Sequence, residues 1–208
     1  MKRVLTPTDY RSAARLLQCE IAALRAVAEV EAPMGGFLGD GRLRVLFEGH
    51  VFHRQTAGKF AESHPTLCFP KWTREFYARG KDADERGAGE LARLETAITL
   101  DRRAALCSAS YGKFQLMGFS HRSCAYPDVE SFYGGMRIDE QAQLDAFCHF
   151  IKAMGMLQAL RDLDWTKLAR LYNGPAFKSN DYDGKLARAY QQLGRAEAPI
   201  AARATLAA

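Results

Sequence analysis

Long apolar runs are missing from this sequence of 208 residues, and no segment is apolar over the length that a membrane-spanning helix needs. The N-terminus, which begins Met1-Lys2-Arg3, also lacks the apolar core of a secretory signal peptide. We therefore expect a protein that is made and folded in the cytoplasm and does not insert stably into a membrane. Apolar residues make up 48% of the chain, which argues against a disordered or fibrous protein.

Cysteine is scarce and shows no paired spacing. The five cysteines are an odd number, so we expect buried, reduced thiols instead of a disulfide framework. Two histidines and two of the cysteines are close enough in sequence to suggest a zinc site formed by His121, Cys124, Cys148 and His149. Their spacing fits no standard zinc pattern, so the sequence predicts no metal site.

Charge of one sign is not concentrated in any block of the chain. The net charge of +5 and the pI of about 9.0 favour association with polyanions, but the 24 acidic residues are interspersed among the 29 basic ones. A solvated surface of mixed charge explains the pattern equally well. No predicted helix combines clustered Arg and Lys with aromatic residues, so nucleic-acid binding is a rival function that the pattern does not favour.

Helical patterns dominate the chain. Thr6-Pro7-Thr8-Asp9 supplies an N-cap, a proline at the first helical position and an acid three residues after the cap, which predicts a helix to about Gln18. A second helix over residues 20–31 ends before Pro33 and Gly35-Gly36. Leu91, Leu94 and Ile98 share one face of a further helix, and helical patterns follow over residues 101–107, 111–117, 128–136, 139–154, 164–172 and 182–193, with Asp128, Asp139 and Asp164 as N-caps.

Only one strand is predicted, over residues 43–48, where apolar and polar side chains alternate. Residues 63–89 contain prolines, glycines and many charges and are expected to form a long surface excursion. No linker divides the chain, so we expect one domain over residues 1–193 and an Ala- and Arg-rich tail over residues 194–208. This organisation leaves no room for a separate wall-binding module.

One carboxylate lies at an unusual position in the second helix. On a helical wheel of 100° per residue with Ile21 at 0°, the apolar face is centred at about 310° and Glu31 falls inside it, at about 280°. Glu29 points to the far side, at about 80°. Partial burial and the C-terminal end of the helix both disfavour a negative charge, so the pKa of Glu31 should be raised. A general acid that holds its proton near neutral pH has these properties; the alternative is an exposed residue at a frayed helix end.

Three segments resemble, in order, the motifs of the lysozyme-like superfamily. They are Ala26–Ala32 (AVAEVEA), Ser110–Gly118 (SYGKFQLMG) and Leu171–Pro175 (LYNGP). In that superfamily the first motif ends on the acid that protonates the glycosidic oxygen, and the other two line the substrate cleft. The resemblance therefore implies that Glu31 is the general acid. Ala32 departs from the pattern, because the superfamily often has serine after the acid.

More narrowly, four segments are similar to the N-acetylmuramidase family of phage and prophage endolysins: Gly36–Leu38, Asp40–Arg42, Leu46–Phe52 and Tyr172–Pro175. The resemblance covers about residues 9–192. It implies a mainly α, lysozyme-like α+β fold, helical with one small β-hairpin beside the cleft. It also implies hydrolysis of the β-1,4 bond between N-acetylmuramic acid and N-acetylglucosamine in peptidoglycan glycan strands, without a cofactor.

Hydrolysis of a glycosidic bond normally needs a second carboxylate. Glu48 is favoured because it follows a strand among apolar residues, and Asp40, in a glycine-rich turn, is the alternative; each also has a structural explanation, Glu48 as an ion-pair partner and Asp40 as a turn residue. A separation of about 6.5–9.5 Å from Glu31 would indicate inversion, and about 5–5.5 Å would indicate retention.

The binding residues are expected mainly from the motifs. Tyr111, Gln115, Tyr172 and Asn173 combine flat faces with hydrogen-bonding groups, which suits N-acetylated sugars, although singly such residues are often core or cap positions. His50 is expected beside Glu48, where it supports that carboxylate and adjoins substrate.

Two rivals share much of this pattern. A lytic transglycosylase has the same three motifs but forms 1,6-anhydro products with one acid, and a wall-binding protein could have lost catalysis altogether. We expect a monomer that reaches the periplasmic cell wall, either as a phage lysis enzyme or as a toxin against other bacteria. The sequence leaves the route of delivery and the host range open.

Overall fold

The computed structural model describes residues 2–197. Within them the chain forms two compact units, and each unit is assembled from two separate segments. Unit 1 takes residues 2–4 and 34–150, and unit 2 takes residues 5–33 and 151–197. The sequence predicts one domain over residues 1–193, and the structure distinguishes these two units inside it. Most of the predicted tail lies outside the described residues.

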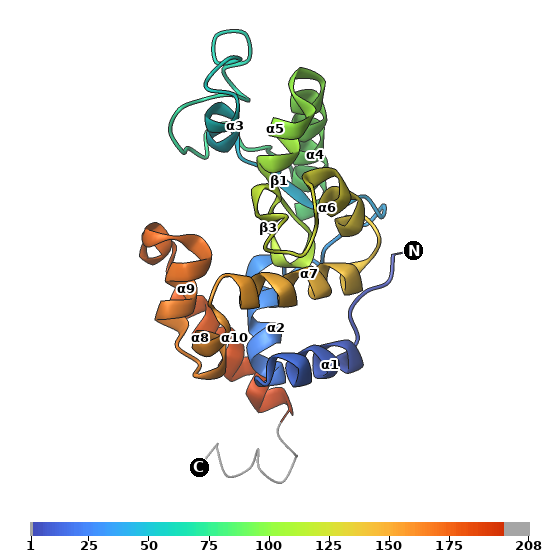
Figure 1. The fold of residues 1–208 in the computed structure, drawn as a ribbon, viewed down its shortest axis with the longest axis vertical. Helices are drawn as coiled ribbons and strands as arrows, with labels where there is room; N and C mark the ends of the chain where they lie inside the picture. Colours follow the sequence, from blue (N-terminus) through green and yellow to red (C-terminus); the bar gives the residue numbers. More distant parts are fainter. Residues whose placement is uncertain (1, 198–208) are drawn as a thin grey trace. The chain divides into compact units, whose positions relative to one another are not determined.

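Unit 2 is helical (Figure 1). Its helices are α1 (Pro7–Leu17), α2 (Ile21–Glu31), α8 (Leu157–Arg161), α9 (Trp165–Asn173) and α10 (Tyr182–Glu197), and a 3₁₀ helix, η3, spans Pro175–Asn180. The predicted capping box at the start of α1 is confirmed, because Thr6 and Asp9 each accept a backbone N–H bond from the other. The Asp164 carboxylate caps α9 as expected by accepting from the Lys167 N–H at 2.9 Å.

Helix α2 buries a face made largely of alanine. Ala22, Ala23, Ala26 and Ala28 are nearly inaccessible, and α2 packs against both α10 and α1. Small side chains allow neighbouring helix backbones to approach closely, and this packing holds the end of α2 firmly in the unit. Glu29 is exposed, so the predicted orientation of the helix is confirmed.

Unit 1 combines a small antiparallel sheet with helices. The strands are β1 (Val45–Phe47), β2 (Ala109–Tyr111) and β3 (Leu116–Met117), in the order β1-β2-β3. The helices are α3 (Gly49–Gln55), α4 (Ala83–Leu100), α5 (Arg102–Cys107), α6 (Val129–Met136) and α7 (Glu140–Ala153), whose last three residues belong to unit 2. The largest fully buried side chains of this unit are aromatic: Phe47, Phe52, Tyr111, Phe114, Phe132 and Phe147.

The mainly α fold class with a small β element is confirmed, but two local predictions are wrong. Residues 111–117, expected to be helical, form the β2–β3 hairpin with the short 3₁₀ helix η1 (Gly112–Phe114) in its connection. Gly112 and Gln115 both have positive φ values, of 72° and 44°, which an α-helix cannot accommodate. The strand over residues 43–48 is therefore not the only one in the chain.

The surface excursion begins and ends about seven residues earlier than predicted. Residues 56–82 are rich in turns, but α4 begins at Ala83, where the Asp82 carboxylate accepts the backbone N–H bonds of Asp84 and Glu85. The acidic first turn overrides the glycines at positions 87 and 89. The five cysteines are free thiols, and four of them are buried. None of the described helices is long and apolar enough to cross a bilayer.

Candidate active site

Glu31 is the last residue of α2, and its carboxylate accepts a hydrogen bond from the hydroxyl of Tyr182, the first residue of α10. The side chain as a whole keeps some exposure, but its carboxyl group is enclosed by protein atoms. Burial raises the pKa of Glu31 to about 7, and the bond from Tyr182 opposes part of that rise. A carboxyl group with this pKa is substantially protonated at neutral pH.

Tyr182 is held in place by two residues of the third motif, Leu171–Pro175. Its ring stacks on Tyr172, with centroids 6.4 Å apart and planes 13° from parallel, and its hydroxyl bonds to the Asn173 side chain. Gly174, with φ of 75°, ends α9 in a conformation that favours glycine and lets the chain turn towards α10. Tyr172 and Asn173 therefore reach Glu31 through Tyr182, a residue that the sequence analysis missed.

Glu48, the favoured candidate for the second carboxylate, lies between strand β1 and helix α3, where it is the N-cap residue. The Tyr77 hydroxyl lies 2.9 Å from each of its oxygens and donates to them, and the Glu48 side chain is only 15% exposed. The pKa of Tyr77 is raised, first by burial and then by the charge of Glu48, so the phenol keeps its proton. Tyr77 lies in the turn-rich excursion and is not among the residues predicted from the sequence motifs.

One buried carboxylate fixes the backbone on both sides of this pair. Glu90 of α4, 4% exposed, accepts the N–H of Phe47 at 3.1 Å and that of Ala78 at 2.6 Å. Arg93 lies 2.8 Å from the same carboxylate and also donates to the Phe47 carbonyl. The residue before Glu48 and the residue after Tyr77 are thus tied to one side chain.

His50 lies beside Glu48, as the sequence predicts. Its Nδ1 is 3.3 Å from Glu48 Oε2, close enough for an ion pair if the ring is protonated. The geometry does not form a hydrogen bond, and Nδ1 is buried without another hydrogen-bond partner among the described residues. His50 is therefore a neighbour of the carboxylate, while Tyr77 is the residue that binds it.

Asp40 occupies an exposed turn in unit 1. Its carboxylate accepts the backbone N–H of Arg42 at 3.0 Å and pairs with the Arg42 guanidinium at 2.7 Å, and these bonds lower its pKa. It lies at an apolar pocket of about 380 Å³ formed in part by Met34 and Phe37. This geometry matches a turn residue more closely than a carboxylate that activates water.

The central motif contributes Gln115. Its side chain accepts from Ser110 Oγ at 2.7 Å and donates to the Gly112 carbonyl at 2.9 Å, which leaves it partly exposed at the hairpin. The expectation for Tyr111 is corrected: its ring is 0% exposed and its hydroxyl donates to the Leu106 carbonyl at 2.8 Å. A ring with no exposed surface cannot stack on a sugar, so Tyr111 is a core residue.

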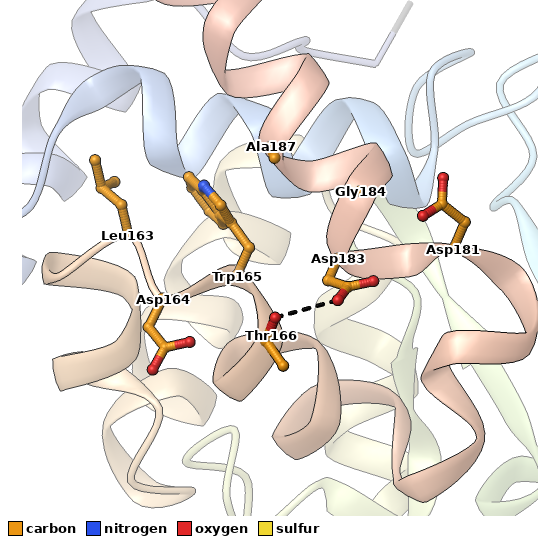
Figure 2. A pocket seen from close by; sticks show the side chains of 8 residues that line it. All are labelled: Leu163, Asp164, Trp165, Thr166, Asp181, Asp183, Gly184 and Ala187. Carbon is orange, nitrogen blue, oxygen red and sulfur yellow. Dashed lines mark hydrogen bonds between the residues drawn. The ribbon is translucent and has the colours of Figure 1, made fainter.

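An open pocket of about 460 Å³ lies elsewhere in unit 2 (Figure 2). It contains no predicted site residue. Its three carboxylates have structural partners: Asp164 caps α9, Asp181 pairs with Arg188, and Asp183 accepts from Thr166. No three His, Cys, Asp or Glu side chains of residues 2–197 come together in a way that could hold a metal ion.

Residues 20–194, a range that includes Glu31 and Glu48, match the family model described as Muramidase, N-acetylmuramidase. The chain belongs to the N-acetylmuramidase family. The muramidase is also similar to the solved structure titled "Crystal structure of Burkholderia AP3 phage endolysin", with 43% sequence identity and a TM-score of 0.78. That match covers 94% of this chain and 73% of the other. No curated protein matches the chain significantly.

The family and the similar structure identify the chain as a glycoside hydrolase that degrades peptidoglycan. The prediction of an endolysin-type muramidase is confirmed, and neither the transglycosylase nor the inactive wall-binding protein is favoured. Two tyrosines that the motifs did not reveal bind the two strongest carboxylate candidates. The signals available in the sequence were the position of Tyr182 just after the third motif and the density of aromatic residues around Tyr77.

Proposed function

We propose that the muramidase cuts the β-1,4 bond from N-acetylmuramic acid to N-acetylglucosamine with Glu31 as general acid and Glu48 as the second carboxylate. The observation that carries the proposal is the Glu31 carboxyl group, desolvated at the end of α2 and with a pKa raised to about 7. Such a group can still give a proton to the leaving sugar oxygen near neutral pH, when an ordinary carboxyl group is ionised.

Glu48 has an environment suited to the opposite role. An ionised carboxylate only accepts hydrogen bonds, and a phenol that donates to both of its oxygens matches that form. Glu48 can then act on a water molecule or on the developing positive charge of the sugar. His50, Gln115, Tyr172 and Asn173 remain proposed contributors to sugar binding.

Asp40 is the weaker candidate for the second carboxylate, because it is exposed and its oxygens are occupied by Arg42. We further propose that the muramidase acts as a monomer on the periplasmic wall. An inverting mechanism would need about 6.5–9.5 Å between the two acting carboxyl groups.

The test is the rate at which purified variants clear chloroform-permeabilised Gram-negative cells. Glu31→Gln and Glu48→Gln should each lose about two to four powers of ten in rate. Glu29→Gln and Asp40→Asn are the matched controls, because each neutralises a nearby exposed carboxylate, and both should stay within about threefold of wild type. Loss of activity in Asp40→Asn with Glu48→Gln unaffected would move the second role to Asp40.

A further inference from the structure

An exposed tryptophan is attached to the group that binds Glu48. Trp72 is 54% exposed, and its indole Nε1–H donates to the Tyr77 hydroxyl at 3.2 Å. Tyr77 in turn donates to both oxygens of Glu48. The three side chains therefore form one continuous chain of hydrogen bonds in which every donor and acceptor is used consistently.

The backbone around this chain is built to hold it. The Glu90 carboxylate binds the N–H groups of Phe47 and Ala78, which are the direct sequence neighbours of Glu48 and Tyr77. Arg93, itself tied to the carbonyls of Phe47 and Thr66, completes the buried ion pair with Glu90. The backbone next to Glu48 and the backbone next to Tyr77 are thus held by the same side chain, and such support keeps a reacting group in its productive geometry.

Trp72 has no comparable structural task. A side chain that is more than half exposed contributes little to a core, yet its indole is held in place by the bond to Tyr77 and lies 5.6 Å from the Arg74 guanidinium, measured to the ring centroid. A large, rigid and exposed aromatic face is the surface on which the apolar face of a sugar ring stacks in binding sites. Its attachment to Glu48 through a single hydroxyl group places that surface beside the proposed reaction centre.

We propose that Tyr77 is the positioning residue of Glu48 and that Trp72 forms a stacking subsite for an N-acetylated sugar of the glycan strand. The role of Tyr77 rests on the proposed function of Glu48, whereas the role of Trp72 does not. Binding of sugar at Trp72 can be measured without turnover. The surface excursion over residues 56–82 then has a function, because it brings Trp72 and Tyr77 to Glu48 at the start of α3.

The two roles predict different kinetic effects on a soluble glycan substrate, one on kcat and the other on KM. Tyr77→Phe keeps the ring but removes the donor to Glu48, so kcat should fall roughly 10- to 100-fold with little change in KM. Trp72→Ala removes the stacking face and should raise KM roughly 3- to 10-fold with a smaller change in kcat. Trp72→Phe keeps a ring and should restore most of the lost affinity. Tyr190→Phe is the matched control, because Tyr190 also donates to a carboxylate, Glu20, at 2.6 Å.

A binding measurement separates this inference from the catalytic proposal. The chain has two tryptophans, so Trp165→Phe leaves Trp72 as the only indole fluorophore. Titration with the N-acetylglucosamine tetramer should then change its emission saturably, also when Glu48→Gln is added. An emission that does not respond at saturating tetramer would overturn the subsite. A kcat for Tyr77→Phe within about threefold of wild type would overturn the positioning role. Full activity of Glu48→Gln would refute the catalytic role of Glu48 while the emission result still decides the subsite.

Discussion

Replacing Glu31 by glutamine should make the muramidase more stable at alkaline pH and nearly inactive. The pKa of this carboxyl is about 7 in the folded protein against 4.5 without the environment of the fold. Below pH 4.5 the group is protonated in both states. Between the two values the folded protein keeps a proton that the unfolded chain has lost, so wild-type stability falls as the pH rises. Above pH 7 the ionised group bears its full desolvation penalty.

The size of the effect follows from the same shift. A difference of about 2.5 pH units (7 − 4.5), at 1.36 kcal/mol per unit, amounts to about 3 kcal/mol. Glutamine is neutral at every pH and can still accept the hydrogen bond from Tyr182, so it avoids this loss. The free energy of unfolding of Glu31→Gln minus that of wild type should therefore rise by up to about 3 kcal/mol between pH 4 and pH 8.5.

Urea denaturation of wild type, Glu31→Gln and Glu29→Gln at pH 4, 5.5, 7 and 8.5 measures this difference. The control substitutes an exposed carboxylate two residues away, and its difference from wild type should vary little with pH. The pH profile of wild-type kcat/KM should lose activity above about pH 7, where the acid deprotonates. A stability difference for Glu31→Gln that is the same at all four pH values would refute the argument that Glu31 is desolvated.

Two further substitutions test the residues around the carboxylates. Tyr182→Phe removes a bond that lowers the pKa of Glu31, so the alkaline limb of kcat/KM should move to higher pH and kcat should fall; an unmoved limb would show that Tyr182 does not act through Glu31. Gln115→Ala should lower lytic activity about tenfold with a modest loss in Tm, because it removes a partly exposed amide whose two bonds, to Ser110 and the Gly112 carbonyl, lie within the β2–β3 hairpin. If Tm collapses while the folded fraction keeps full specific activity, Gln115 is structural.

Local signals explain how much of the fold was predictable. Helix starts with a capping side chain, such as Thr6 and Asp164, were predicted because capping joins a side-chain oxygen to a backbone N–H within three residues. The short helices α3 and α8, which have no side-chain N-cap, were not predicted, and the start of α4 was placed too late. The orientation of α2 was predictable from its apolar period alone. The β2–β3 hairpin was not predicted because its turn depends on positive φ values at Gly112 and Gln115. A positive φ is uncommon for glutamine, so the residue type at position 115 does not indicate a turn.

The candidate site was predictable only in part. Glu31 and Glu48 stand out as acids among apolar neighbours, and this is a property of nearby sequence. The phenols that bind them come from 151 and 29 residues further along the chain, and no local pattern encodes such a pairing. Tyr111 shows the reverse error: it belongs to a motif, yet its aromatic ring is packed against Phe132 in the core, with centroids 5.6 Å apart.

The central claim is that Glu31 supplies the proton for hydrolysis of the muramic acid bond. Its most direct test is mass spectrometry of the muropeptides released from purified peptidoglycan by wild type and by folded Glu31→Gln. The account predicts reducing N-acetylmuramic acid ends from wild type and about 100- to 10,000-fold slower release from the variant. Predominantly 1,6-anhydro ends, or release by Glu31→Gln within about threefold of wild type, would contradict it.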